Sequence, residues 1–199
     1  MPRFPLFPSI VVLAAVATMI ALGFWQLGRL DEKEALLSRY QAAAGIDAPV
    51  AYPVGSPANA RDLLYRRSSI DCAFIAGDWQ SVAGRSADGR SGYVHIIDCG
   101  TTTATTETDE NAYVQAGWSP GPTPPDWKSG RVTGRIAPYS DGGVRLVADP
   151  PLGGLEASAR PDPGDLPNNH LAYAVQWFLF ALTALVIYVL ALKRKQRGG

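Results

Sequence analysis

The chain has 199 residues, of which 47% are hydrophobic, and its 18 basic and 18 acidic residues give a formal net charge of zero. This length suits one compact domain, and the composition is ordinary for a globular protein. The charges are unevenly placed, because residues 29–169 hold all 18 acidic residues and 13 of the basic ones. This acidic centre gives no reason to expect nucleic acid as a partner, since nucleic-acid-binding proteins present basic surfaces to phosphates.

Two uncharged apolar stretches lie near the two ends of the chain. Ser9 to Leu27 has 19 residues without a charge, and Leu171 to Leu192 has 22. A helix rises about 1.5 Å per residue, so each stretch can cross a hydrocarbon core about 30 Å thick. Arg3 precedes the first stretch and a basic tail, residues 193–199, follows the second. The positive-inside rule therefore predicts two cytoplasmic termini and an exported centre.

A cleaved signal peptide is the alternative for the first stretch, because Ala15-Val16-Ala17 is a small-x-small triplet. Cleavage there would leave the apolar run 18–27 on the mature N-terminus, so we expect a retained span. The N-terminus lacks the Arg- and Ser-rich composition of a mitochondrial leader. The exported centre is therefore expected in a periplasm or an equivalent space.

The centre alternates strand-like runs with turn residues, so we predict a membrane protein of α+β class. Two transmembrane helices flank an exported, mainly antiparallel β domain, either a small barrel or a sandwich. The predicted strands lie near residues 66–75, 92–98, 111–118, 130–137 and 144–148, and residues 101–111 form a Thr-rich acidic loop. The predicted segments are residues 1–8 (cytoplasmic N-terminus), 9–28 (transmembrane helix 1), 29–60 (juxtamembrane helix to Gly45, then linker), 61–150 (periplasmic β domain), 151–169 (Pro/Gly-rich tether), 170–192 (transmembrane helix 2) and 193–199 (basic cytoplasmic tail).

Motifs for chemistry are weak in the centre. Gly117-Trp118-Ser119-Pro120-Gly121 matches the G-x-S-x-G pattern of serine hydrolases. The residue after the serine is a proline, which has no N–H for an oxyanion hole, so we interpret the stretch as a strand end and turn. His95 is expected to be a structural strand residue, and no zinc, P-loop or dinucleotide motif occurs. The centre thus has no enzyme signature, which favours binding or assembly.

Two further pairs leave alternatives open. Cys72 and Cys99 are the only cysteines, and in an exported domain they could form a disulfide or remain two buried thiols. They do not form a CxxC redox motif. Arg66 and Arg67 precede a predicted strand and could bind a partner or an anionic head group, or act as ordinary surface residues.

His170 stands where the exported centre meets the second span. Pro167 cannot lie inside the helix, and Asn168 or Asn169 can cap it, so His170 falls in the first turn. The partial positive charge of a helix N-terminus favours a neutral imidazole, which leaves one ring nitrogen free to bind a metal. The alternative is a polar residue that forms hydrogen bonds at the headgroup boundary.

Each span also carries a face of small residues with one large ring. We predict that the spans pack together through these faces, with Arg29 and His170 at similar depth. The faces are Ala14, Ala17, Ala21, Trp25 and Gly28 in the first span, and His170, Ala174, Trp177, Ala181 and Ala184 in the second.

Both span boundaries resemble the signature stretches of the Surfeit locus protein 1 family. The stretches are Gly23-Phe24-Trp25-Gln26-Leu27-Gly28-Arg29-Leu30 with Lys33, and Asn168-Asn169-His170-Leu171-Ala172-Tyr173-Ala174-Val175-Gln176-Trp177-Phe178. Between them, Gly92-Tyr93 and the stretch 112–120 are similar to the family's G-Y and R-G-W-x-P strands. Ala116 stands where that pattern has an arginine. The resemblance covers the whole chain.

The resemblance implies a cytochrome c oxidase assembly factor of the bacterial inner membrane, not an enzyme, that binds haem a. It implies His170 as the ligand of the haem iron, and delivery of the haem to oxidase subunit I. We expect Trp25, Tyr173 and Trp177 around the ring and Arg29 on a propionate, because guanidinium binds carboxylate in a bidentate manner. Trp25 and Arg29 could equally be interface anchors.

Oxidase subunit I, haem a synthase and membrane lipid are the expected partners, and the oligomeric state is open. One alternative is a membrane scaffold that binds oxidase subunits through its exported domain and never holds haem. The other is a membrane-tethered hydrolase, which requires a reactive Ser119.

Overall fold

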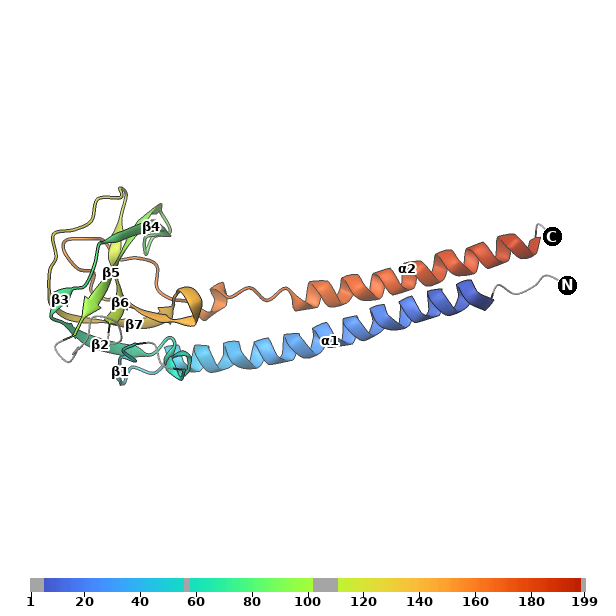
Figure 1. Cartoon of the computed structure of the whole chain (residues 1–199), viewed down its shortest axis with the longest axis horizontal. Coiled ribbons are helices and arrows are strands. Elements are labelled where there is room, and N and C mark those ends of the chain that lie inside the picture. The colour runs from blue at the N-terminus through green and yellow to red at the C-terminus, as the bar shows by residue number, and fades with distance from the viewer. Residues whose placement is uncertain (1–5, 56–57, 102–110, 198–199) are drawn as a thin grey trace. The chain divides into compact units, whose positions relative to one another are not determined.

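The computed structural model describes residues 6–55, 58–101 and 111–197 (Figure 1). Arg3 and most of the predicted acidic loop, with Asp109 and Glu110, lie outside these residues. The chain forms two compact units. The helical unit comprises residues up to 37 and from 166 onwards, and the β unit comprises residues 38–165.

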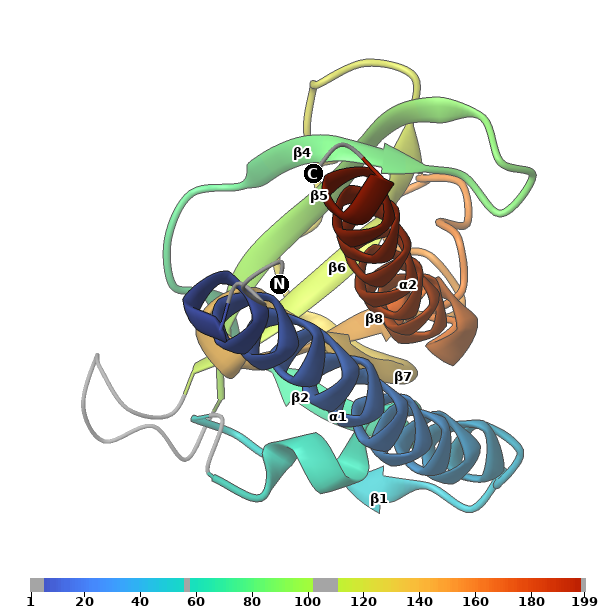
Figure 2. The ribbon, with the colours of Figure 1, turned by 90° about the vertical axis from the view of Figure 1, so that its right-hand side faces the viewer.

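The helical unit consists of α1 (Leu6–Ala44, whose last residues, 38–44, belong to the β unit) and α2 (His170–Arg197). The two helices run antiparallel and side by side (Figures 1 and 2). Both are long and apolar enough to cross a membrane by length and composition, and most of the apolar window of each is not buried by protein. The chain thus has the architecture expected of an α+β membrane protein. α1 ends as predicted, where the Gly45 N–H reaches the carbonyls of Gln41 and Ala42.

The helices pack through a regular seam that differs from the predicted one on α1. The predicted face of α1, Ala14 to Gly28, is exposed, whereas the predicted face of α2 faces its partner with Ala174 and Ala181 buried. Seven buried or half-buried residues in α1 recur with alternating spacings of three and four, the period of a coiled-coil seam. They are Ser9, Val12, Val16, Met19, Gly23, Gln26 and Leu30, and the half-buried Leu22 and Leu27 flank them. The prediction was wrong for α1 because the small alanines of α2 leave room for larger side chains of α1 at the helix interface.

Gly23 is the point of closest approach in this seam. A Cβ at that position would lie 2.5 Å from the Phe178 ring, so only glycine admits the ring there. The Phe178 ring also meets Phe24 edge to face, with centroids 5.4 Å apart. Near the other end, the Ser9 and Tyr188 hydroxyls share a hydrogen bond.

The β unit is one curved, mixed sheet. Its strands are β1 (Val50–Ala51), β2 (Arg67–Cys72), β3 (Phe74–Ile75), β4 (Gln80–Arg85), β5 (Ser91–Gly100), β6 (Asn111–Ser119), β7 (Gly130–Pro138) and β8 (Val144–Ala148). The order is β1-β2-β7-β8-β6-β5-β3, with β4 also paired to β5. β1 with β2 and β6 with β8 run parallel, and the other pairs are antiparallel. The described strands therefore form a half-barrel, neither a closed barrel nor a sandwich.

All five predicted strand regions are present, but β1 and β4 were not predicted. β1 has only two residues. β4 has the sequence Gln-Ser-Val-Ala-Gly-Arg, which lacks the alternation of apolar and polar residues that marks a half-buried strand. Its hydrogen bonds to β5 are made by backbone groups, which every sequence supplies.

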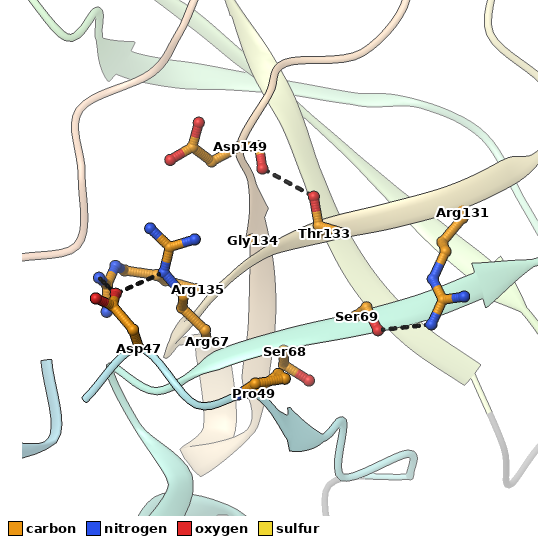
Figure 3. Close-up of a pocket in the computed structure, with 10 residues that line it drawn as sticks. All are labelled: Asp47, Pro49, Arg67, Ser68, Ser69, Arg131, Thr133, Gly134, Arg135 and Asp149. Carbon is orange, nitrogen blue, oxygen red and sulfur yellow. Dashed lines mark hydrogen bonds and ion pairs between the residues drawn. The ribbon is translucent and has the colours of Figure 1, made fainter.

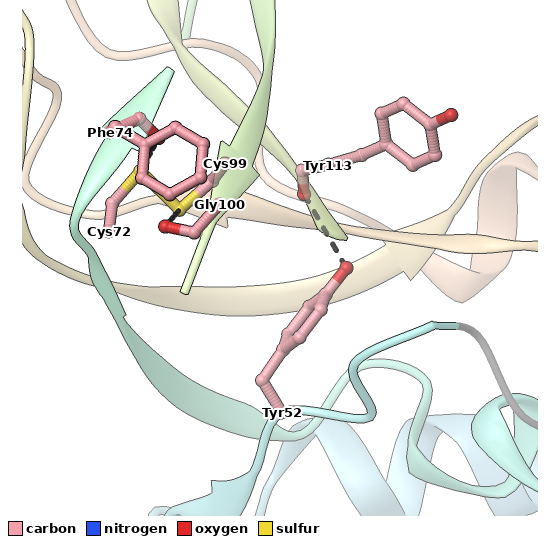
Figure 4. Close-up of a disulfide and its surroundings, with 6 residues drawn as sticks. All are labelled: Tyr52, Cys72, Phe74, Cys99, Gly100 and Tyr113. Carbon is pink, nitrogen blue, oxygen red and sulfur yellow. Dashed lines mark hydrogen bonds between the residues drawn. A yellow bond between two sulfur atoms is a disulfide. The ribbon is translucent and has the colours of Figure 1, made fainter. Parts of the chain in front are cut away.

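The predicted linker, residues 46–60, contributes several of its described residues to the folded core. Tyr52 is buried, and its hydroxyl donates to the Val144 carbonyl over 2.9 Å. The same hydroxyl lies 3.5 Å from the Tyr113 carbonyl (Figure 4). Burial raises the pKa of this phenol. Val132, Ile136 and Leu146 from the central strands are fully buried in the same cluster. The chain between α1 and β2 thus closes one side of the half-barrel.

The predicted tether, residues 151–169, is also bonded to the sheet along part of its length. Trp118 on β6 exchanges backbone hydrogen bonds of 2.8 and 3.0 Å with Glu156. The Leu152 N–H donates to the Ala116 carbonyl, and the Ala159 N–H donates to the Arg85 carbonyl. Proline and glycine content predicted an extended tether, whereas the segment contains turns, two isolated bridges to the sheet and the 3-10 helix Pro163–Asp165.

A disulfide joins Cys72 at the end of β2 to Cys99 on β5, with a Cα–Cα distance of 5.4 Å (Figure 4). The structure thus decides between the two alternatives for these cysteines. The bridge links two strands that are not neighbours in the sheet and closes a chain segment of 27 residues. A cross-link over such a segment stabilises the fold by about 3–4 kcal/mol in the chain-entropy description.

We expect Gly134→Ala to destabilise the β unit strongly. A Cβ on Gly134 would lie 2.0 Å from the Val147 carbonyl oxygen, and backbone cannot move aside as a side chain can. Overpacking of this kind costs about 3 kcal/mol. Thermal unfolding of the detergent-solubilised chain, followed by near-UV circular dichroism, measures the loss. Gly77→Ala is the control, because its Cβ meets nothing within 4 Å. Equal melting of the two variants would contradict the prediction.

Candidate functional site

His170 is the first residue of α2, as predicted. The first helical hydrogen bond runs from the Tyr173 N–H to the Asn169 carbonyl over 3.2 Å. Asn168 does not cap through its side-chain oxygen, which is buried without a hydrogen-bond partner among the described residues. His170 itself is half-buried, so its ring lies at the edge of the seam.

The imidazole of His170 is held by Gln26 from the other helix. The Gln26 amide oxygen lies 2.8 Å from Nδ1 of His170. An amide oxygen can only accept, so Nδ1 carries the proton and the lone pair of a neutral ring resides on Nε2. A hydrogen bond to one ring nitrogen fixes the tautomer and the ring orientation of metal-binding histidines in the same way. Within the helical unit, therefore, one imidazole nitrogen is oriented and kept available.

Sequence reasoning did not assign a role to Gln26, although a signal was present. Gln26 is the only amide within the uncharged stretch 9–27. A polar group in an apolar span requires a hydrogen-bond partner, because lipid offers none. That partner had to come from the other helix. Which residue it is depends on how the two helices pack, and the predicted packing face was wrong for α1.

The other predicted site residues fall on one flank of the helix pair. Because each residue turns a helix by about 100°, the positions of Gln26 and His170 fix where their neighbours point. The neighbours on this flank are Trp25, Arg29, Tyr173 and Trp177. Trp25 is 58% exposed and Tyr173 is 52% exposed. The opposite flank is filled by the Phe24–Phe178 ring pair.

Arg29 lies one helical turn beyond Gln26 in α1. Its guanidinium pairs with Glu32, and the side chains of Arg29 and Glu32 are 50% and 66% exposed. An exposed pair of this spacing contributes about 0.5 kcal/mol or less. Arg29 can therefore exchange Glu32 for another carboxylate at little cost.

A second polar group forms in the β unit, around His95. The buried imidazole lies on β5, with Nδ1 2.9 Å from the Ser81 hydroxyl and Nε2 2.7 Å from the Ser119 hydroxyl. Ser81 comes from β4 and Ser119 ends β6, so the ring joins three strands. Burial lowers the pKa of His95, which keeps the ring neutral near pH 7. The structural role expected for His95 agrees with these contacts.

The sequence profile of the SURF1 family matches residues 13–182. That match covers most of α1, the whole β unit and the first 13 residues of α2. The chain belongs to the SURF1 family. Among curated proteins, none matches the sequence. The SURF1 family is linked to cytochrome c oxidase assembly, and its members are assembly factors rather than typical enzymes.

In this SURF1 protein the G-x-S-x-G stretch serves packing. Gly117 has φ +155°, and a Cβ there would lie 2.8 Å from the Glu156 carbonyl oxygen. Ala116, where the sequence resemblance led us to expect an arginine, is fully buried inside the sheet, and its carbonyl accepts from the Leu152 N–H.

Ser119 and His95 do meet the distance requirement of a nucleophile and its base. The remaining requirements are not met by the described residues around them. Ser81, not a carboxylate, occupies Nδ1 of His95, and the Ser119 hydroxyl can also donate to the Gly121 carbonyl over 2.7 Å. Pro120 supplies no N–H to an oxyanion.

We expect no labelling of Ser119 by a fluorophosphonate probe. The hydroxyl has a base within reach, but nothing stabilises the negative charge that develops on the attacked group. Intact-protein mass spectrometry after incubation of the full chain measures the adduct, and Ser119→Ala is the matched blank. A wild-type adduct that is absent from Ser119→Ala would establish the hydrolase alternative.

Proposed function

We propose that this SURF1 protein binds haem a through His170 and assists its delivery to subunit I of cytochrome c oxidase. The Gln26–His170 hydrogen bond supports the ligand assignment most directly, because it directs the Nε2 lone pair away from Gln26. Family membership supports the link to oxidase assembly. The two together favour a carrier over a scaffold that never holds haem.

The donor set fits a haem iron. Neutral imidazole is a common axial ligand of haem iron. A hydrogen bond to the ring nitrogen that does not bind the iron raises the basicity of the nitrogen that does. Haem a, when bound, supplies an iron that accepts such a nitrogen. The described residues offer no group of three or more metal-binding side chains, so they favour a haem iron over a bare metal ion as the group bound.

The seam indicates where the macrocycle would lie. Gly23 is filled by Phe178, and Ala174 is completely buried, so the helices touch directly next to His170. We therefore place the ring on the flank with Trp25, Tyr173 and Trp177 rather than between the helices. On that flank Arg29 would exchange Glu32 for a propionate.

A single protein ligand suits transient binding. The chain has two histidines, and His95 is buried in the β unit with both ring nitrogens engaged. Release from His170 thus requires one coordination bond to break. We propose haem a synthase as the donor and subunit I as the acceptor, with both in the same membrane.

We also propose a bacterial inner membrane location, with both termini cytoplasmic and the β unit periplasmic. The basic last turn of α2, with Arg194, Lys195 and Arg197, favours the cytoplasmic side for that end. The Cys72–Cys99 disulfide fits an oxidising compartment for the β unit.

We expect His170→Ala to abolish haem retention. The protein would be purified in detergent from cells that also make haem a, and haem content would be read from the visible spectrum per chain. Wild type is expected to carry close to one haem and the variant almost none. Leu171→Ala, which truncates an exposed neighbour, is the control and should keep its haem. A colourless wild type would favour the scaffold alternative instead.

Gln26 should tune the ligand rather than supply it. We expect Gln26→Leu to weaken haem retention about tenfold, because the ligating imidazole loses the hydrogen bond that orients it. Gln26→Glu should keep the haem but lower its reduction potential, because a carboxylate gives the imidazole more anionic character. Resonance Raman spectra of the iron–histidine stretch and a redox titration measure both effects.

Thr18→Val is the matched control, since it removes another polar group from α1, one that bonds only to the Ala14 carbonyl of its own helix. This variant should leave the iron–histidine stretching frequency and the haem reduction potential unchanged. Gln26 variants that keep wild-type values in both measurements would show that Gln26 only packs against the ring.

A further inference from the structure

The outer face of β2 and β7 gathers three arginines, which line one pocket together with Asp47 and Asp149. Arg67 on β2 lies directly opposite Arg135 on β7, and Asp71 lies opposite Arg131. Side chains two residues apart share one face of a sheet, so all three arginines point to the side away from the buried Ile70 and Val132. This face was only hinted at by the Arg66–Arg67 pair in the sequence.

Two arginines opposite each other repel unless an anion lies between them. Asp47, from the segment after α1, supplies it: its Oδ1 is 3.1 Å from Nε of Arg67 and 3.9 Å from an NH2 group of Arg135. Arg135 is fixed in place, because its other terminal nitrogen donates to the Ala44 and Tyr65 carbonyls over 2.9 and 3.0 Å. The site is thus built around one carboxylate.

The arginines line a pocket of about 280 Å³. Figure 3 shows Asp47, Arg67 and Arg135 at one end of it, and Arg131 with Ser69 at the other. Arg131 donates to the Ser69 hydroxyl over 3.3 Å, which leaves the hydroxyl proton for a further acceptor. Arg135 and Arg131 are four residues apart on one strand, so the two cationic ends lie about 13 Å apart.

We propose that this pocket binds an acidic peptide segment of a partner protein. Two acidic side chains four residues apart on an extended chain match the spacing of the two cationic ends. Asp47 shows the kind of group that one end accepts. Its side chain is 83% exposed, so it is an internal counter-ion that an external carboxylate can displace.

Charge complementarity favours a peptide over a single small anion, because one phosphate or carboxylate would reach only one end. The counter-ion at the second end is equally weak, since Asp71 lies 3.8 Å from Arg131 and both side chains are more than two-thirds exposed. The proposal does not depend on haem binding, because every residue that it uses belongs to the β unit.

Fluorescence anisotropy of labelled Glu-Thr-Val-Thr-Glu with the detergent-purified full chain tests the site at low salt. We expect Arg67→Gln/Arg131→Gln to weaken binding about tenfold, and Asp47→Asn to tighten it about threefold, in line with exposed ion pairs. Arg135 is left intact because it holds two backbone carbonyls. Glu-to-Gln substitution in the peptide should remove binding.

Control variants change the same charge elsewhere on the β unit. Arg85→Gln/Lys128→Gln should bind the peptide as wild type does, and so should Asp126→Asn, because these exposed residues do not line the pocket. Equal effects of the control and pocket variants would overturn the proposal, leaving only general charge attraction. Binding to phosphatidylglycerol vesicles that is lost in Arg67→Gln/Arg131→Gln, with no binding of the peptide, would also overturn the proposal and assign the pocket to a lipid headgroup.

Discussion

The hydrogen bond between Gln26 and His170 is the constraint on which the helical unit depends. It requires two residues far apart in sequence to meet at one depth, so it fixes how the two helices are aligned along their length. Within that alignment Gly23 must receive Phe178, and the α2 alanines must face the larger α1 side chains. The same bond decides which imidazole nitrogen carries the proton. Helix packing and ligand chemistry therefore follow from one contact.

The β unit depends on a different device, coverage of the sheet by segments without regular structure. The described residues around Tyr52 close one side, and backbone bonds from the 152–159 segment close another. Backbone groups left without partners inside a fold cost free energy, so irregular segments are held wherever they can pair with a strand. Gly117 and Gly134 lie where another backbone segment approaches so closely that a Cβ would clash with its carbonyl oxygen.

The sequence predicted what depends on local pattern and missed what depends on pairing. Uncharged length identified both apolar helices, and alternation identified five strand regions correctly. The disulfide, the Ser119–His95 contact and the three arginines of β2 and β7 each join residues that only the register brings together. The α1 seam failed for a related reason: small residues suggest close packing, but complementarity to the partner decides which face is used.

The candidate sites in the two units share one physical property, which is the weakness of each individual bond. In the proposed haem site, a haem held by one imidazole, with a propionate paired to an exposed arginine, would be retained by few interactions. In the proposed peptide site, an acidic segment would compete with Asp47 for the arginines. Tight binding at either place would oppose turnover, because an assembly factor must let go of both cargo and partner. When the helical site is empty, Gln26 still orients the His170 ring. When the β-unit pocket is empty, Asp47 still neutralises its arginines.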